Sequence, residues 1–315
     1  MKAMILAAGF GNRMRPLSDR CPKPLLPVLG RPLIDYLIEH LKTISIKKIG
    51  VNIHHWANKM EAYLKDGSQW GVEIIISREK EVLGTGGGME AMRHFLSDEG
   101  PFLVYNGDIL SDIDLNELIR FHFYYQPLVT MALYDYPPIN NVTLSSEGKV
   151  VDFLGKRGVS RAEKDKNLTF TGISIVDPSV FDFIPRAEFS SIIDVYLNLL
   201  DQWPGCIQGY TVQGKYWIDI GTPTSYLQVH KDILFNGKTV LPLKRFQGMR
   251  VYKGVGTIIE PGGKLEGFVS VGKNCIIRKR AFLKNCVVWD NTEVKEGVYL
   301  ENGVMDGEWK HSIFF

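Results

Sequence analysis

Short apolar runs recur along the first hundred residues, and most are too short to form a buried helix. Because fully buried strands have this pattern, we predict strands at Met4–Ala8, Ile49–Ile53, Val72–Ile76 and Phe102–Tyr105. Leucines four residues apart within Pro32–Lys42 place one apolar face on a helix, and proline suits the first turn of a helix. Further helices are predicted at Ala57–Leu64 and Met89–Phe95.

This alternation of strands and helices predicts an α/β fold, with a Rossmann-like, mixed and mostly parallel sheet that has helices on both faces. Such sheets bind ligands in the crevice at the carboxyl ends of their strands. Later segments are predicted to complete the domain: strands at Val150–Leu154, Leu168–Val176, Cys206–Tyr210 and Tyr216–Ile220, then a helix at Pro223–Phe235. We therefore expect a first domain at residues 1–235.

The pattern changes around Asn236–Lys244, after which glycine is frequent and apolar residues recur every six positions. One series is Ile276, Phe282, Val288, Val294 and Leu300, and another is Val271, Ile277, Leu283 and Trp289. A six-residue period is typical of a hexapeptide β-helix, so we predict a small left-handed β-helix-like domain at residues 236–315, with room for two or three coils. An ordinary meander of short strands is the alternative.

Composition limits the function further. The 37 Lys and Arg nearly balance the 35 Asp and Glu, for a net charge of +2, so we expect no nucleic acid as a partner. The first apolar run ends at Ala8, too early for a signal peptide or a membrane span, and we predict a cytoplasmic protein with no membrane contact. The four cysteines have no zinc-like spacing.

Candidate phosphate-binding residues follow the first strand. Gly9 and Gly11 allow the backbone to approach a triphosphate, and Arg13 adds a charged hydrogen-bond donor. The dinucleotide fingerprint requires glycine where Met14 stands, and the P-loop signature is absent. A tight turn is the alternative explanation for these glycines. Nearby prolines stiffen the following segment and hold Lys23 in a fixed place, so Lys23 is a further candidate.

Two carboxylates are the candidate metal ligands. Asp108 follows the apolar run Phe102–Tyr105, at the carboxyl end of a predicted strand, and Asp219 lies in the apolar run Trp217–Ile220. Carboxylates together with phosphate oxygens are what Mg²⁺ prefers, and a buried carboxylate without a partner is costly. A shared Mg²⁺ would account for both, although Asp108 could also cap a turn.

Several blocks together resemble the sugar-1-phosphate nucleotidyltransferase family, over roughly residues 1–235. The most specific are Leu6–Leu17 followed by Pro22–Pro27, and the others come in the family's order: Glu81–Gly88, Asn106–Asp108, Phe170–Ile173 and Trp217–Pro223. The resemblance implies an enzyme that joins a nucleoside triphosphate to a sugar 1-phosphate, releases pyrophosphate and depends on Mg²⁺.

The resemblance also implies a role for each matching residue. The nucleotide would be bound by Ala8, Gly9, Gly11, Arg13, Lys23, Gly86 and Gly87. The residues that carry catalysis would be Arg13, Lys23, Asp108 and Asp219, with the two aspartates as ligands of the metal. The sugar would be bound by Asn106, Lys156 and Gly172, although Leu154–Arg157 departs from the Glu-Lys-Pro of many members. Attack by the sugar phosphate on the α-phosphorus needs no protein nucleophile, so catalysis is positioning and charge neutralisation.

Within the family, the chain is most similar to N-acetylmuramate-1-phosphate uridylyltransferases and to mannose-1-phosphate guanylyltransferase-like members. UTP with an N-acetylmuramate-1-phosphate-like sugar is therefore the first expectation. GTP with mannose 1-phosphate, or dTTP or UTP with glucose 1-phosphate, is the alternative. The short uridylyltransferases lack an appended β-helix, and such appendages mediate self-association or regulation in the wider family, which implies a homo-oligomer.

Two other classes of protein are alternatives. An inactive nucleotide-sugar sensor would be expected to lose the metal carboxylates or the phosphate lysine, yet Asp108, Asp219 and Lys23 are all present. A fused β-helix acyltransferase needs more coils than the tail can form, and His311 is the only histidine there.

Overall fold

The computed structural model describes residues 1–158, 163–186, 188–238, 243–307 and 309–313. Its contacts divide the chain into two compact units. The first unit contains Met1–Phe10, Leu37–Ile109 and Ile113–Trp217, and the second contains Gly11–Tyr36, Leu110–Asp112 and Ile218–Phe315. The predicted boundary between residues 235 and 236 stays a prediction, and residues 239–242 beside it lie outside the described residues.

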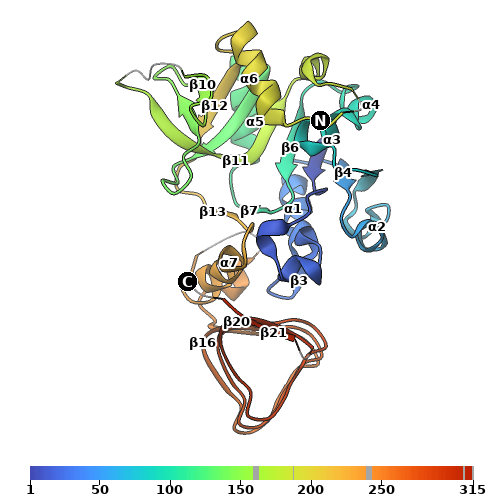
Figure 1. The fold of residues 1–315 in the computed structure, drawn as a ribbon, viewed down its shortest axis with the longest axis vertical. Helices are drawn as coiled ribbons and strands as arrows, with labels where there is room; N and C mark the ends of the chain where they lie inside the picture. The colour runs from blue at the N-terminus through green and yellow to red at the C-terminus, as the bar shows by residue number, and fades with distance from the viewer. Residues whose placement is uncertain (159–162, 187, 239–242, 308, 314–315) are drawn as a thin grey trace. The chain divides into compact units, whose positions relative to one another are not determined.

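A mixed sheet forms the centre of the first unit (Figure 1). Its strands are β1 (Ala3–Leu6), β4 (Lys48–Ile53), β5 (Glu73–Arg78), β6 (Phe102–Asn106), β8 (Val129–Tyr134), β9 (Val142–Leu144), β10 (Val150–Phe153), β11 (Lys166–Val176) and β12 (Ile207–Thr211). The order β6-β1-β4-β5 is parallel, as is the pair β8-β12, whereas β11 runs antiparallel to β6, β8 and β9. The predicted α/β fold is confirmed.

Helices pack on both faces of this sheet, as the alternation of side chains along the strands requires. The helices of the first unit are α2 (Ala57–Leu64), α3 (Gly84–Glu90), α4 (Arg93–Leu96), α5 (Leu115–Tyr125) and α6 (Ile192–Gln202), together with most of α1 (Leu33–Lys42). On one face, Val129 and Met131 join a buried core with residues of α4 and α6. On the other face, the Thr130 hydroxyl lies 2.9 Å from Nδ1 of His122 in α5, and the Tyr105 hydroxyl lies 3.1 Å from Nδ1 of His40 in α1.

The helix expected at Met89–Phe95 differs in the structure. One helix, α3, begins at Gly84 inside the glycine run, and a second, α4, begins at Arg93. Glycine has low helix propensity, so the run gives no local signal for a helix. Here the missing side chains let the helix pack against Ser190, and that contact outweighs the propensity. Helices α5 and α6 were not predicted.

The second unit begins with the segment after the first strand. It contains three short 3₁₀ helices, η1 (Asn12–Met14), η2 (Leu17–Asp19) and η3 (Lys23–Leu25), then the strand pair β2 (Pro27–Val28) and β3 (Arg31–Pro32). Helix α7 (Pro223–Leu234) follows the short sheet of β7 (Ile109–Ser111) and β13 (Trp217–Asp219). Its first turn has Pro223 inside a capping box made by Thr222 and Ser225.

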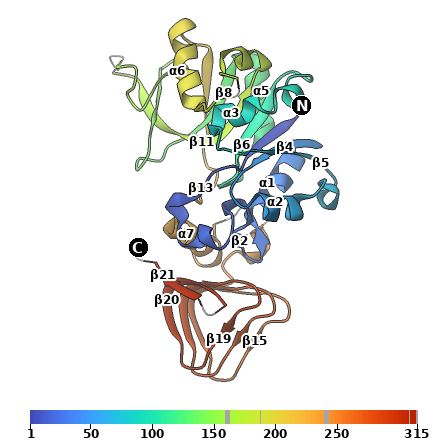
Figure 2. The same cartoon turned by 45° about the vertical axis from the view of Figure 1, so that its right-hand side comes forward.

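The remainder of the second unit is a parallel β-helix whose coils have three sides (Figures 1 and 2). Its strands are β14 (Val251–Lys253), β15 (Ile258–Ile259), β16 (Lys264–Val271), β17 (Ile276–Ile277), β18 (Phe282–Val288), β19 (Glu293–Val294), β20 (Tyr299–Asp306) and β21 (Trp309–Ser312). The ladders β14-β16-β18-β20 and β15-β17-β19 are parallel, except that β21 closes the end antiparallel to β20. A meander would pair neighbouring strands antiparallel, so that alternative is wrong.

The coil length explains why the six-residue period holds only in part. Val271 pairs with Val288 and Val288 with Met305, positions 17 apart, whereas Lys264 pairs with Phe282, 18 apart. Three sides of six residues give 18, so a coil of 17 moves the buried positions by one. Phe282 and Ile276 of the first predicted series are consequently only half-buried.

None of the helices among the described residues is both long and apolar enough to cross a membrane.

Candidate active site

A cavity of about 190 Å³ opens in the first unit, where the parallel strands β1 and β6 end and beside the last residues of β4. It is lined by Leu6, Ala8, Gly9, Asn52, Val82, Gly84, Thr85, Asn106 and Asp108. Ligands of α/β sheets bind at this end of the strands. Of the predicted residues, the cavity brings together Ala8, Gly9, Asn106 and Asp108.

The register of the sheet explains this meeting. Leu6, the last residue of β1, pairs with Asn52 on one side and with Asn106 on the other. The segments that follow these three strands therefore begin side by side at the same edge of the sheet. The amide of Gly107 also donates a 2.8 Å hydrogen bond to the Leu6 carbonyl, and this contact holds the turn that carries Asp108 beside the end of β1.

A buried network joins two segments of the cavity wall. The side-chain oxygen of Asn52 accepts a 2.8 Å hydrogen bond from the Ala7 amide, and its nitrogen donates to the Glu79 carboxylate at 2.7 Å. The other oxygen of Glu79 accepts from the Leu83 amide at 3.0 Å. Buried polar networks with satisfied partners are rigid, so the start of the glycine loop and the segment before α3 are held together.

Gly172 makes room for Asn106. Its φ of +80° favours glycine, and an added Cβ would lie 2.7 Å from the side-chain nitrogen of Asn106. The neighbouring Thr171 carbonyl accepts a 2.9 Å hydrogen bond from the indole nitrogen of Trp217. Strand β11 is thus fixed where it passes Asn106.

Gly86 and Gly87 have packing contacts. Their amides both donate to the Ser190 carbonyl, at 2.8 and 3.2 Å, and an added Cβ would lie 2.8 Å from the Ser190 hydroxyl or 2.7 Å from the Glu188 carbonyl. They are not among the residues that line the cavity. Their predicted contact with the nucleotide stays a prediction.

Lys156 lies apart from the cavity lining. Its ammonium group pairs with the Asp194 carboxylate at 3.0 Å, and both side chains are exposed. An exposed pair of this kind contributes little stability, so it is a weak restraint on the lysine. The predicted contact with the sugar stays a prediction.

The second unit carries the other predicted phosphate ligands, on a compact loop. Gly11 has a φ of +70°, and its carbonyl accepts a 2.9 Å hydrogen bond from the Ser18 hydroxyl. An added Cβ at Gly11 would lie 3.3 Å from the Lys23 side chain. The aliphatic stem of Lys23 therefore packs against the glycine, and the loop restricts where its ammonium group can reach.

Arg13 and Asp219 form an ion pair, with a nitrogen-to-oxygen distance of 3.6 Å. Gly221 lies against it: an added Cβ would be 2.7 Å from an Asp219 oxygen and 2.9 Å from an Arg13 nitrogen. Both are predicted site residues. Although they lie far apart in the sequence, the second unit brings them into contact.

Divalent metals are compatible with these side chains. Among the described residues there is no group of three or more His, Cys, Asp or Glu that could hold a metal ion. Mg²⁺ is commonly held by one or two carboxylates plus water and substrate phosphates, so two aspartates suffice chemically. Asp108 belongs to the first unit and Asp219 to the second.

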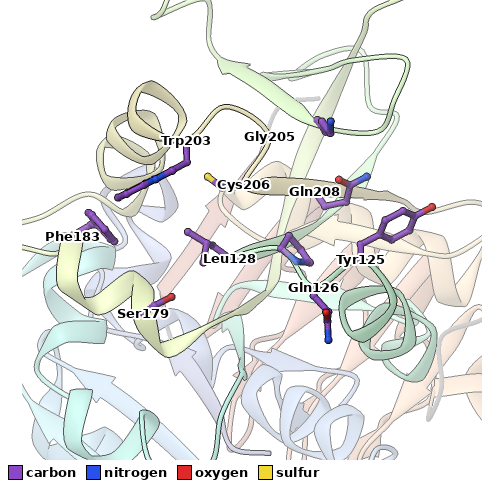
Figure 3. Close-up of a pocket in the computed structure, with 11 residues that line it drawn as sticks. Tyr125, Gln126, Leu128, Ser179, Phe183, Trp203, Gly205, Cys206 and Gln208 are labelled. Atoms are coloured by element: carbon purple, nitrogen blue, oxygen red, sulfur yellow. The ribbon is translucent and has the colours of Figure 1, made fainter.

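A larger cavity, of about 620 Å³, lies in the first unit beside the amino-terminal ends of β8 and β12 (Figure 3). Its wall includes Leu128, Phe183, Trp203 and Cys206 and none of the predicted site residues. Val129 at this end of β8 pairs with Val176, which pairs with Phe102 at the start of β6, whereas Asn106 ends that strand. The two cavities therefore lie toward opposite ends of the sheet.

Sequence reasoning missed part of the cavity wall. Asn52 and Thr85 line the cavity but are not among the predicted site residues, although Thr85 lies in the block Glu81–Gly88. Thr85 also accepts a 2.9 Å hydrogen bond from the Ile192 amide at the start of α6. The signal available for Asn52 was a polar residue within an apolar strand, which signifies a buried partner.

Comparison with known proteins agrees with this geometry. The model of a family described as nucleotidyl transferase matches residues 2–236, so the chain belongs to that family. The chain is 30% identical to a UTP–glucose-1-phosphate uridylyltransferase of Synechocystis sp., over 98% of the chain and 88% of the relative. A Mycobacterium tuberculosis mannose-1-phosphate guanylyltransferase is 30% identical, over 95% and 82%.

A third relative, the N-acetylmuramate alpha-1-phosphate uridylyltransferase of Neisseria meningitidis, is 36% identical over 70% of the chain and 94% of its own length. The predicted class, a sugar-1-phosphate nucleotidyltransferase, is confirmed. Among solved structures, HddC from Yersinia pseudotuberculosis complexed with GMP-PN has the same fold, with a TM-score of 0.59 at 21% identity over 72% of this chain and 97% of that one.

Proposed function

We propose that this enzyme transfers uridine monophosphate from UTP to an N-acetylmuramate-like sugar 1-phosphate and releases pyrophosphate. The observation that carries the proposal is the cavity at the carboxyl ends of β1 and β6, which contains Ala8, Gly9, Asn106 and Asp108. The choice of substrates is supported by the 36% identity to the Neisseria relative, higher than the 30% of the other two.

A second candidate is a hexose 1-phosphate, glucose with UTP or mannose with GTP. It is favoured by coverage: the Synechocystis and Mycobacterium relatives align with 98% and 95% of the chain, including its carboxyl-terminal part, whereas the Neisseria relative aligns with 70%.

The glycine loop would bind the triphosphate through its backbone. Apart from Gly9 and its chain neighbours, no atom of the described residues lies within 4 Å of an added Cβ at Gly9, so a phosphate can approach its backbone closely. Ala8 would bind beside it, and Gly11 keeps the following turn in its left-handed conformation. Arg13 and Lys23 would neutralise the phosphate charge, while Gly86 and Gly87 would lie near the base.

Asp108 and Asp219 would hold Mg²⁺, which when bound neutralises phosphate charge and orients the triphosphate. Each aspartate is also positioned by protein contacts. The amide of Gly107 fixes the turn before Asp108, and Arg13 pairs with Asp219. Arg13 is thus placed to exchange the carboxylate for phosphate as substrate enters.

The sugar would bind along β11. Gly172 leaves space for the Asn106 side chain, whose amide can hydrogen-bond sugar hydroxyls. Lys156 would approach the sugar phosphate after leaving its exposed pair with Asp194.

Pyrophosphate release tests the proposal. The purified enzyme with Mg²⁺ is given UTP, GTP, dTTP, CTP or ATP with N-acetylmuramate, glucose or mannose 1-phosphate. UTP with N-acetylmuramate 1-phosphate should give the highest kcat/KM, and Asp108→Asn should reduce it at least about a hundredfold. Asp182→Asn, which breaks an exposed pair with Arg93, is the matched control. Preference for a hexose supports the second candidate, and no turnover with any pair would overturn both.

The division of labour and the assembly are also proposed. Residues 1–235 would form the catalytic domain, which the family match to residues 2–236 supports, and residues 236–315 the β-helix domain. We propose that the β-helix mediates a homo-oligomer in the cytoplasm. Light scattering on the full chain tests self-association, and a monomer at micromolar concentration would contradict it.

A further inference from the structure

The β-helix supports one short segment of the second unit, Arg20–Gly30, which carries Lys23: two contacts are direct and a third runs through Tyr226 of α7. At one end, the Arg20 guanidinium donates a 2.7 Å hydrogen bond to Asp306 of β20, and it lies 5.3 Å from the ring of Trp309 in β21. At the other end, an added Cβ at Gly30 would overlap the hydroxyl of Tyr252 in β14. Both ends of the segment are therefore held by the β-helix.

The middle of the segment is held by a buried relay. The indole nitrogen of Trp289 donates to the hydroxyl of Tyr226 in α7 at 3.1 Å, and that hydroxyl donates to the Pro27 carbonyl at 2.6 Å. Tyr226 is 0% exposed and Trp289 7%. Burial also raises the pKa of Tyr226 well above its ordinary value, so the hydroxyl remains a donor.

We propose that the β-helix positions Lys23 for the triphosphate, and that Tyr226 and Trp289 are the positioning residues that transmit this support. The inference rests on the proposed function, because it takes Lys23 as a phosphate ligand. Lys23 begins η3, only four residues before Pro27, and Pro24 stiffens the chain between them. A shift at Pro27 is therefore passed to Lys23 rather than absorbed by a flexible loop.

The relay has a defined consequence for kinetics. Tyr226→Phe removes the hydrogen bonds to both Trp289 and Pro27 and keeps the ring that packs against His230. Loss of one such hydrogen bond changes an equilibrium constant by about three- to tenfold. We expect KM for UTP to rise about three- to tenfold, with KM for the sugar 1-phosphate unchanged. Trp289→Phe should act in the same direction with a smaller effect.

Matched controls separate positioning from general loss of stability. Trp70→Phe changes a tryptophan of similar burial, at 9% exposure, that packs against Tyr63 in the first unit. Asp306→Asn, which weakens the contact with Arg20, should raise KM for UTP as Tyr226→Phe does. Glu293→Gln, which breaks a 2.7 Å pair with Arg278 elsewhere on the β-helix, should not.

A double-mutant cycle gives the decisive comparison. If the relay acts through Lys23, Tyr226→Phe should weaken UTP binding in the native background but not in the Lys23→Ala background. Calorimetric titration with UTP and Mg²⁺ measures this without turnover, so failure of the proposed reaction and failure of this inference give different results. Equal losses in both backgrounds, or an equal rise in both KM values, would overturn the inference.

Discussion

The side-chain amide of Asn52, in the wall of the candidate active site, donates a 2.7 Å hydrogen bond to the carboxylate of Glu79, and both side chains are buried. Through this bond Ala7, the residue after β1, is joined to Leu83, just before α3. Two segments that are predicted to contact the nucleotide thus share one support.

Asn52→Ala should lower both stability and nucleotide affinity. The substitution leaves the buried Ala7 amide and a Glu79 oxygen without their partner, which costs about 2 kcal/mol in the free energy of unfolding. Urea unfolding measures that loss, and titration with UTP measures the affinity. Asn116→Ala on the exposed surface of α5 is the control. Nucleotide affinity equal to that of the native protein would show that the network is purely structural.

Gly9→Ala should separate binding from stability. Among the described residues other than its chain neighbours, no atom lies within 4 Å of an added Cβ at Gly9, and its φ is not in the left-handed region. We therefore expect a Tm change of no more than about a degree, since surface substitutions without a special role change stability by only about 0.5 kcal/mol. UTP affinity should fall at least about tenfold if phosphate approaches this backbone. Unchanged affinity would remove Gly9 from the phosphate site.

Gly221→Ala should disturb the pair formed by Arg13 and Asp219. The new methyl group would lie under 3.0 Å from atoms of both side chains, and both can move away because their ends are flexible. Stability should change little, whereas kcat/KM should fall at least about tenfold because the displaced groups are proposed to bind metal and phosphate. Comparison with Asp219→Asn tests the origin of the loss, since Gly221→Ala should add little in that background.

Acid should destabilise the second unit through His230. Burial lowers the pKa of His230 from 6.5 to about 4 and outweighs the backbone hydrogen bonds, which act in the opposite direction. The neutral ring bonds the Tyr226 carbonyl at 2.9 Å and lies 3.5 Å from the Leu29 amide. Because the folded pKa is the lower one, its contribution is complete above pH 6.5 and is lost as pH falls toward 4, by about 3 kcal/mol in total.

The test is the unfolding free energy of His230→Gln and of the native protein between pH 7 and pH 4. Burial also lowers the pKa of His40 and of His122, so both proteins should lose stability on acidification. The variant should lose less, and the control His94→Gln, at an exposed position, should follow the native protein. Parallel curves for His230→Gln and the native protein would contradict the assignment.

Local pattern was sufficient for much of the fold. Apolar runs located β4 and β6, and leucines four residues apart located α1, because burial of one face or of a whole strand imposes those periods. Asp108 was predicted at the end of a strand from the same pattern, and it lines the cavity.

Contacts between distant segments decided the rest. The glycine run became a helix because Ser190 approaches it, and the six-residue period shifted because a coil can have 17 residues. The sequence alone determined the α/β and β-helix architecture and the family, since these depend on periodicity and on residues close together in the chain. Only the tertiary structure decided that Asn52 braces the cavity and that Trp289 supports the Lys23 segment, because partners so far apart leave no local pattern.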